Sequence, residues 1–154
     1  PIIMAELQYN IKLNKLNNVL TEQLALSDVE GSSIFCVPEP GRESHGSFIQ
    51  NKSFLTQKKI IVTTDKLDNV LKLLGISKVD FIKIDVEGAE MQVFRGAVEL
   101  LTGPCKPTII FESAETCCQP FGHRVFDVLS YLNDCGYSVE QVEYSEYLAE
   151  PLLI

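Results

Sequence analysis

Two acidic residues close an apolar segment of the sequence and could take part in chemistry. Asp85 ends residues 79–85, a pattern that predicts a buried strand, and Glu87 follows two residues later. Gly88 then allows the backbone to turn tightly into a following helix, because it has no Cβ. A carboxylate at the end of an apolar strand costs desolvation energy unless a partner or ligand requires it there. We therefore interpret Asp85 and Glu87 as candidate catalytic residues.

A third acid, Glu112, ends the next predicted strand, residues 107–112. If the two strands are neighbours in a parallel sheet, Asp85 and Glu112 would flank one crevice at the carboxyl ends of the strands, where such sheets bind ligands. Paired carboxylates there could accept a hydrogen bond from a hydroxyl, take up a proton or hold a divalent cation. The alternative is a solvent-exposed strand end with unrelated acids. We include Glu112 among the candidate catalytic residues.

Other titratable side chains receive a structural interpretation. Glu90 lies in the first turn of the helix after Gly88, where it would complement the positive end of the helix dipole. His123 could be a general base, but we interpret it as a residue at a helix start without a special role. The cysteines form no C-x-x-C pair, and we expect reduced thiols and no metal site at positions 36, 105, 117, 118 and 135.

The elements that must position these residues follow from the apolar pattern. Short apolar strands alternate with amphipathic helices, which predicts an α/β domain with a parallel sheet and helices on both faces. Strands are expected at residues 19–26, 33–37, 59–63, 79–85, 107–112, 137–142 and 147–153. Helices are expected at residues 5–16, 66–74, 89–101 and 124–135, with Asp65 capping the second and Gly75 ending it. Residues 38–53 have the composition of a loop.

Composition narrows the classes of partner. The 154 residues suffice for one domain, and the net charge of -8 is spread without a basic stripe. Nucleic acid is therefore not expected as a partner, since it would require a basic surface. No apolar run reaches the roughly 20 residues that span a bilayer. We expect a cytoplasmic domain without a membrane segment.

Several longer blocks of the chain resemble a known family. The chain contains, in this order, NIKLNKLNNV, EQLALSDVEGS, KIDVEGAEMQVFRGAVELL, KPTIIFE and GHRVFDVLSYLNDCGYSV. Together these blocks resemble the FkbM-type methyltransferase family over nearly the whole chain. The resemblance implies a Rossmann-like class I methyltransferase fold with strand order 3-2-1-4-5-7-6. It also implies S-adenosylmethionine as cofactor and a small-molecule acceptor, methylated on a hydroxyl of a sugar, lipid or secondary metabolite.

The resemblance also implies roles for individual residues. Residues after the family's third strand, here Ala25, Leu26 and Asp28, would lie near the adenine of the cofactor. Asp85 would lie near its methionine end and the reacting methyl group. Glu112 matches the acid that ends the family's fifth strand. A divalent cation beside the carboxylates is an alternative that the residues leave open.

The chain departs from the family at its beginning. It contains no G-x-G, and Pro1 matches the position directly after the acid that closes the family's second strand. We therefore expect residues 1–154 to form a single partial domain without the first strand and the Gly-rich loop, whose backbone N–H groups hold much of the cofactor. Weak or absent binding of S-adenosylmethionine by the chain alone is expected. The alternative function is a non-catalytic methyltransferase-like domain that binds another protein.

Overall fold

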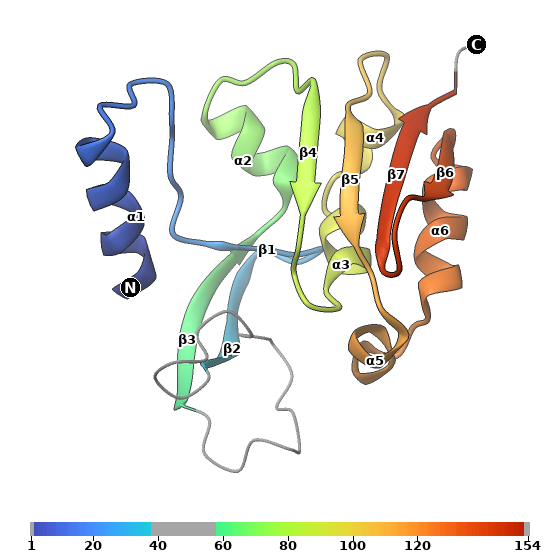
Figure 1. The fold of residues 1–154 in the computed structure, drawn as a ribbon, viewed down its shortest axis with the longest axis horizontal. Coiled ribbons are helices and arrows are strands. Elements are labelled where there is room, and N and C mark those ends of the chain that lie inside the picture. Colours follow the sequence, from blue (N-terminus) through green and yellow to red (C-terminus); the bar gives the residue numbers. More distant parts are fainter. Residues whose placement is uncertain (1, 38–57, 153–154) are drawn as a thin grey trace.

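Two mixed β-sheets and several short helices make up the computed structural model, which describes residues 2–37 and 58–152 (Figure 1). The three-stranded sheet has the order β1-β3-β2, with β1 parallel and β2 antiparallel to β3. Its strands are β1 (Ala25–Leu26), β2 (Gly31–Val37) and β3 (Lys58–Asp65). The four-stranded sheet has the order β4-β5-β7-β6. Its strands are β4 (Phe81–Ile84), β5 (Thr108–Glu112), β6 (Tyr137–Gln141) and β7 (Glu146–Pro151).

The register of the larger sheet brings two predicted site residues to one edge. β4 and β5 are parallel and Ile84 pairs with Phe111, whereas β7 is antiparallel to both β5 and β6. Asp85 and Glu112 directly follow this pair. The expected neighbourhood of the two strands is therefore confirmed, and both acids lie at the carboxyl ends of β4 and β5.

One face of the four-stranded sheet forms the main core. Burial alternates along β5 and along most of β7, and the buried residues of each strand share a face. Phe111 packs edge-to-face on Phe94 of α3 (Glu90–Arg95), with ring centroids 5.4 Å apart, and stacks on Tyr147 at 5.3 Å. Figure 1 shows α3, α4 (Val98–Thr102) and α6 (Val125–Asp134) behind the strands. In the described part of the chain the expected helical cover is thus seen on one face only.

The predicted helix at residues 89–101 is divided into α3 and α4 at Gly96. The carbonyl of Gly96 accepts a hydrogen bond from the N–H of Asp68, at 3.1 Å, instead of continuing a helical ladder. A Cβ at Gly96 would lie 2.1 Å from the carbonyl oxygen of Ser27, so the backbones approach there as only glycine permits. The Asp68 carboxylate then accepts from the N–H groups of Glu99 and Leu100, at 2.8 and 3.1 Å. Asp68 thereby satisfies free N–H groups at the start of α4.

The turn after α2 (Leu67–Leu73) ends that helix as its sequence predicts. Gly75 has a φ of 67°, and its N–H bonds to the carbonyl of Lys72. The N–H of Ile76 bonds to the carbonyl of Leu71, which completes a Schellman motif. At the other end, the Asp65 carboxylate accepts from the backbone N–H of Lys66 at 2.7 Å. The N-cap of α2 is Lys66, whose side chain makes no capping hydrogen bond, so the prediction that Asp65 caps this helix is wrong.

Other elements differ from the predictions. The first helix, α1, spans Ile2–Leu13, three residues earlier than expected. Of the predicted strand at residues 19–26 only β1 is formed, since Val19 and Leu20 are exposed. The short helices α5 (Glu115–Cys118) and η2 (Gln119–Phe121, a 3-10 helix) were not predicted. The predicted loop at residues 38–53 and the end of the last predicted strand, Leu153, lie outside the described residues.

Within residues 2–37 and 58–152, no helix has the length and apolar character needed to cross a membrane.

Candidate functional site

The turn after β4 has an unusual backbone. Glu87 has a φ of 52° and Gly88 a φ of 101°, so two successive residues occupy left-handed conformations. For a residue with a Cβ this conformation is unfavourable and requires support from its surroundings. The support comes from Glu90, whose Oε1 accepts a hydrogen bond from the N–H of Gly88 at 2.9 Å. The turn is therefore held in a defined shape at the end of β4, where it follows Asp85 and brings Oε2 of Glu87 to 3.6 Å from Sγ of Cys117.

Asp85 and Leu26 line the same cavity of about 420 Å³, although they come from different sheets. Most of its other lining is apolar and comes from α2, α3 and the segment around β4: Leu67, Leu71, Val79, Phe81, Ile82, Lys83, Ile84, Val86 and Val93. Its volume falls in the range of about 300–1,000 Å³ that is usual for ligand pockets. The structure thus brings together one residue predicted near the adenine and one predicted near the reacting methyl group.

The same cavity runs along an open sheet edge. β4 is the terminal strand of its sheet and pairs only with β5 among the described residues. Phe81 on this strand is 53% exposed. Backbone N–H and C=O groups on such an edge can pair with another strand. The apolar cavity therefore lies beside an edge at which another strand could pair, and Asp85 lies at one end of this edge.

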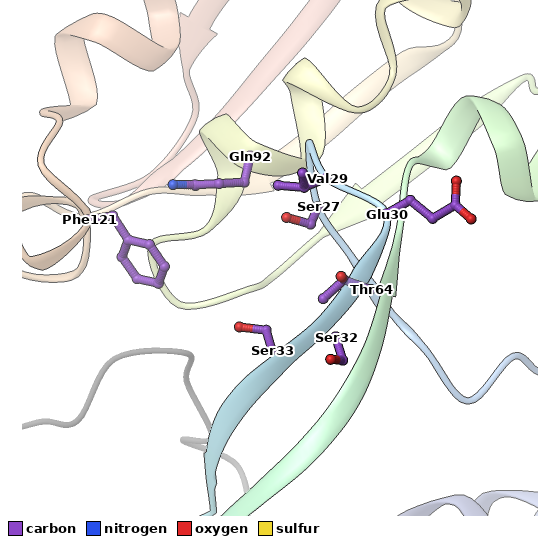
Figure 2. Close-up of a pocket in the computed structure, with 8 residues that line it drawn as sticks. All are labelled: Ser27, Val29, Glu30, Ser32, Ser33, Thr64, Gln92 and Phe121. Carbon is purple, nitrogen blue, oxygen red and sulfur yellow. The ribbon is translucent and has the colours of Figure 1, made fainter.

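A second cavity, of about 400 Å³, lies between the smaller sheet and α3 (Figure 2), and we call it the polar cavity because most residues that line it have polar side chains. It is lined by Ser27, Val29, Glu30, Ser32, Ser33, Thr64, Gln92 and Phe121. The Oε1 atom of Gln92 is buried and has no hydrogen-bond partner among the described residues. An unpaired buried acceptor beside a polar cavity suits a ligand that donates a hydrogen bond. Gln92 could not be found from the sequence, because an isolated glutamine in a helix carries no pattern.

The remaining predicted cofactor residues lie beside this polar cavity. Ala25 pairs with Thr64 in the sheet, and Thr64 lines the cavity. Asp28 lies between the lining residues Ser27 and Val29, and its carboxylate accepts a hydrogen bond from the Ser27 hydroxyl at 3.2 Å. Neither Ala25 nor Asp28 lines either described cavity. Both therefore lie one residue away from the cavity walls.

Glu112 is engaged within its own sheet. Its Oε1 accepts a hydrogen bond from the Ser145 hydroxyl at 2.9 Å, in the segment that leads into β7. Glu146, opposite Glu112 in the register, lies 3.7 Å from the ammonium group of Lys83. Glu112 is near Asp85 by strand register but does not line the cavity that Asp85 lines.

Comparison with known proteins decides the family. A family model described as the methyltransferase FkbM domain matches residues 2–139. The chain belongs to the FkbM methyltransferase family. The resemblance carried by the blocks around Asp85 and Glu112 is thereby confirmed. No match is found among curated proteins or among solved structures.

In this FkbM methyltransferase chain, Glu90 lies in the first turn of α3 as expected, but it does more than complement the helix dipole. Glu90 is 0% exposed, and its side chain turns inward beneath the Asp85–Gly88 turn to bond the N–H of Gly88. Its Oε2 lies 3.9 Å from Sγ of Cys118, which is also fully buried. Burial raises the pKa of the Glu90 carboxyl, and the Gly88 N–H opposes that shift.

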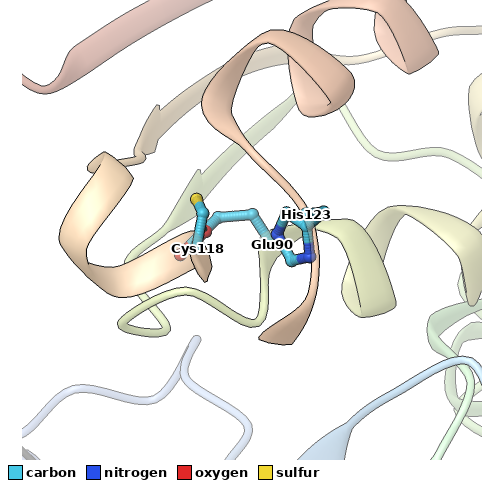
Figure 3. A group of neighbouring side chains, drawn as sticks. All are labelled: Glu90, Cys118 and His123. Carbon is cyan, nitrogen blue, oxygen red and sulfur yellow. The ribbon is translucent and has the colours of Figure 1, made fainter. Parts of the chain in front are cut away.

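His123 also differs from its interpretation as an ordinary residue at a helix start. It lies beside Glu90 and Cys118 in the FkbM domain, and its Nε2 is buried without a hydrogen-bond partner among the described residues (Figure 3). Burial lowers the pKa of the His123 imidazole. Burial also raises the pKa of the Cys118 thiol, to about 11. None of the five cysteines forms a disulfide.

Proposed function

We propose that this chain takes part in S-adenosylmethionine-dependent methylation of a hydroxyl oxygen on a small molecule. One observation carries the proposal: Asp85, which directly follows β4, lines the same cavity as Leu26, the last residue of β1 in the smaller sheet. Both residues match positions that the FkbM family uses for the cofactor. Membership of that family supports methyl transfer in general. S-adenosylmethionine as the methyl donor and a hydroxyl oxygen as the acceptor are what we propose in addition.

The proposal includes a Rossmann-like arrangement in which a further strand pairs with the outer edge of β4. The observed order β4-β5-β7-β6 agrees with the positions 4-5-7-6 of the class I order. The apolar cavity between β4 and Leu26 supports a strand there, because such a strand would bury Phe81 and pair the open edge of β4. The carboxyl end of this edge is where α/β sheets bind ligands.

The residues present fit one part of the cofactor. Apolar side chains such as Leu26 and Val86 offer a surface for an aromatic base, and the Asp85 carboxylate offers a negative charge beside it. Gln92 offers an acceptor for an amino or hydroxyl group. When bound, S-adenosylmethionine would supply a methyl group on a positively charged sulfonium.

Asp85 and Glu87 would act by positioning charge. Asp85 at the cavity rim attracts a cationic group and can accept a hydrogen bond from an acceptor hydroxyl. Glu87, held beside it by the left-handed turn, can accept the hydroxyl proton as the oxygen is methylated. Methyl transfer depends mainly on holding the two reactants in line, so a rigid turn serves this reaction. Glu112, which accepts a hydrogen bond from the Ser145 hydroxyl, would help to hold the carboxyl end of β5 in place.

Two measurements test the proposal. In nuclear magnetic resonance, S-adenosylmethionine should shift the backbone signals of Leu26, Asp85 and Val86 and leave those of β6 unchanged. Affinity should be weak, because the chain has no G-x-G loop to bind the cofactor through backbone N–H groups. Micromolar affinity would contradict the expectation of weak binding. Signal shifts confined to other residues would contradict the proposed position of the cofactor site.

The second measurement follows the methyl group. The protein is incubated with S-adenosylmethionine labelled in the methyl group and with sets of sugars, lipids and hydroxylated metabolites. Label in an O-methyl product is expected. Label on nitrogen or carbon would contradict oxygen as the acceptor atom. Absence of transfer to any small molecule, at S-adenosylmethionine concentrations at which nuclear magnetic resonance shows binding, would favour the non-catalytic alternative.

A further inference from the structure

Three potential metal ligands converge beneath the turn that carries Asp85 and Glu87. Glu90 comes from α3, Cys118 from α5, and His123 from the segment between η2 and α6 (Figure 3). One ligand atom of each lies within 4.8 Å of the others. Among the described residues this is the one group of histidine, cysteine and acidic side chains with that spacing.

Two of the three side chains, Glu90 and Cys118, are oriented by hydrogen bonds outside the cluster. The Gly88 N–H donates to Oε1 of Glu90, which leaves Oε2 directed toward Cys118. The Ser113 hydroxyl lies 3.2 Å from Sγ of Cys118 and can donate to it. Metal-binding side chains in proteins are fixed by such outer partners, which set the orientation of the ligand.

The histidine shows the clearest sign of a missing partner. Its Nε2 is buried and has no hydrogen-bond partner within the described residues. A neutral imidazole has one unprotonated nitrogen, whose lone pair can bind a metal ion. A buried polar atom without a partner is rare and needs an explanation. A bound cation supplies one.

We propose that Glu90, Cys118 and His123 bind one zinc ion. A set of one sulfur, one nitrogen and one oxygen ligand matches zinc, whereas magnesium and calcium require oxygen ligands. Bond lengths of about 2.0–2.3 Å place tetrahedral ligands about 3.3–3.6 Å apart. The observed 3.9 Å between Oε2 of Glu90 and Sγ of Cys118 needs a closure of only a few tenths of an ångström. Water completes the fourth position, and the Cys118 thiol proton is released to solvent on binding.

The zinc ion would connect the site turn to the segment that covers it. Glu90 anchors the Asp85–Gly88 turn, and Cys118 and His123 lie on either side of η2, which contributes Phe121 to the polar cavity. Metal binding therefore fixes α5 and η2 against α3. The proposed role is structural, because none of the three ligands lines the cavity that Asp85 lines.

Metal titration of the purified chain tests the proposal. After treatment with a chelator and dialysis against zinc, elemental analysis should give one zinc ion per chain. Cobalt(II) should occupy the same site and show a thiolate-to-cobalt absorption band with the intense visible bands of tetrahedral coordination. Cys118→Ser should abolish the thiolate band. His123→Gln should weaken binding by at least about 100-fold, more than the loss of an outer partner.

The neighbouring cysteine provides the matched control. Cys117 is adjacent in sequence, and its Sγ lies 3.6 Å from Oε2 of Glu87, outside the cluster. Cys117→Ser should retain one zinc ion and the cobalt band. Because Cys118 is fully buried and Cys118→Ser could fail to fold, His123→Gln with a native circular dichroism spectrum is decisive. Retention of the metal by that variant, loss of it in Cys117→Ser, or cobalt binding without a thiolate band would each overturn the proposal.

Discussion

Gly88 lies directly against the backbone carbonyl of Cys117. A Cβ added to Gly88 would come within 2.1 Å of that oxygen and 2.6 Å of its carbon. Real Cβ atoms do not approach a backbone carbonyl so closely, so the residue after Glu87 must be glycine for the segment of α5 to pack here. This contact links the site turn to a helix 29 positions further along the chain.

Gly88→Ala should destabilise the protein by roughly 2–5 kcal/mol, the sum of a left-handed backbone cost and overpacking. Gly122→Ala is the matched control, because Gly122 also has a positive φ, 83°, but has open space where its Cβ would lie. That variant should lose only about 1–2 kcal/mol. Urea denaturation of both variants measures the difference. Equal losses would mean that Gly88 is required for its backbone angle alone.

Asp85→Asn should reduce methyl transfer by roughly 100-fold or more, the usual scale for losing one well-placed electrostatic or acid–base group. The substitution keeps the volume and removes the charge. Asp80→Asn is the control at the other end of β4, where Asp80 is exposed and pairs with Lys78. Initial rates with labelled S-adenosylmethionine well above its Kd, with circular dichroism to check the fold, give the comparison. Similar small losses in both variants would show that Asp85 is not part of the site.

Asp68→Ala should lower the free energy of unfolding by about 0.5–2 kcal/mol, the range measured for removing a side chain that caps a helix. The carboxylate accepts two backbone N–H groups at the start of α4, and alanine leaves both without this partner. As a reference, Asp80→Ala removes only an exposed ion pair and should change stability by less than about 1 kcal/mol. The melting temperatures of the two variants, measured by thermal unfolding, test this difference in stability. An unchanged melting temperature in Asp68→Ala would show that water replaces the cap fully.

The Cys118 thiol should react slowly with alkylating reagents at neutral pH when a chelator keeps the protein free of metal. Burial raises its pKa to about 11, so at pH 7 only about 10⁻⁴ of it is the reactive thiolate. Its labelling rate should rise about tenfold for each pH unit up to that value, while the fold persists. Cys105, which is exposed, should be modified first. Peptide mass spectrometry over time would show the order, and early labelling of Cys118 would contradict its burial.

Much of the larger sheet could be predicted, because its strands are apolar runs flanked by clear turn residues. Residues 79–85 and 107–112 contain β4 and β5, and Gly75 and Gly136 end helices in left-handed conformations as their sequence positions suggest. The helix break at Gly96 could not be predicted, since it depends on contacts with Ser27 and Asp68 from distant segments. Helix α5 is only four residues long, too short for periodicity to show.

The site was predicted less completely than the fold. Asp85 could be found because an acid at the end of an apolar strand is visible in the sequence. The inward orientation of the Glu90 side chain and the position of His123 beside it could not be predicted, because both depend on packing between α3, α5 and η2. A carboxylate in the first turn of a helix usually faces water, and only the three-dimensional structure shows that this one turns inward.

The break between α3 and α4 at Gly96 is also where the smaller sheet meets the helices of the larger one. The three-stranded sheet contacts α3 and α4 through the close approach of Ser27 to Gly96, with Asp68 of α2 bonded across to α4. Ile34 and Ile61 of that sheet are exposed, whereas Ile109 and Phe111 of β5 are completely buried. Parts with few buried apolar contacts open at lower free energy than the core. The smaller sheet should therefore detach as a unit, and amide protons of β2 and β3 should exchange with solvent earlier than those of β5 and β7.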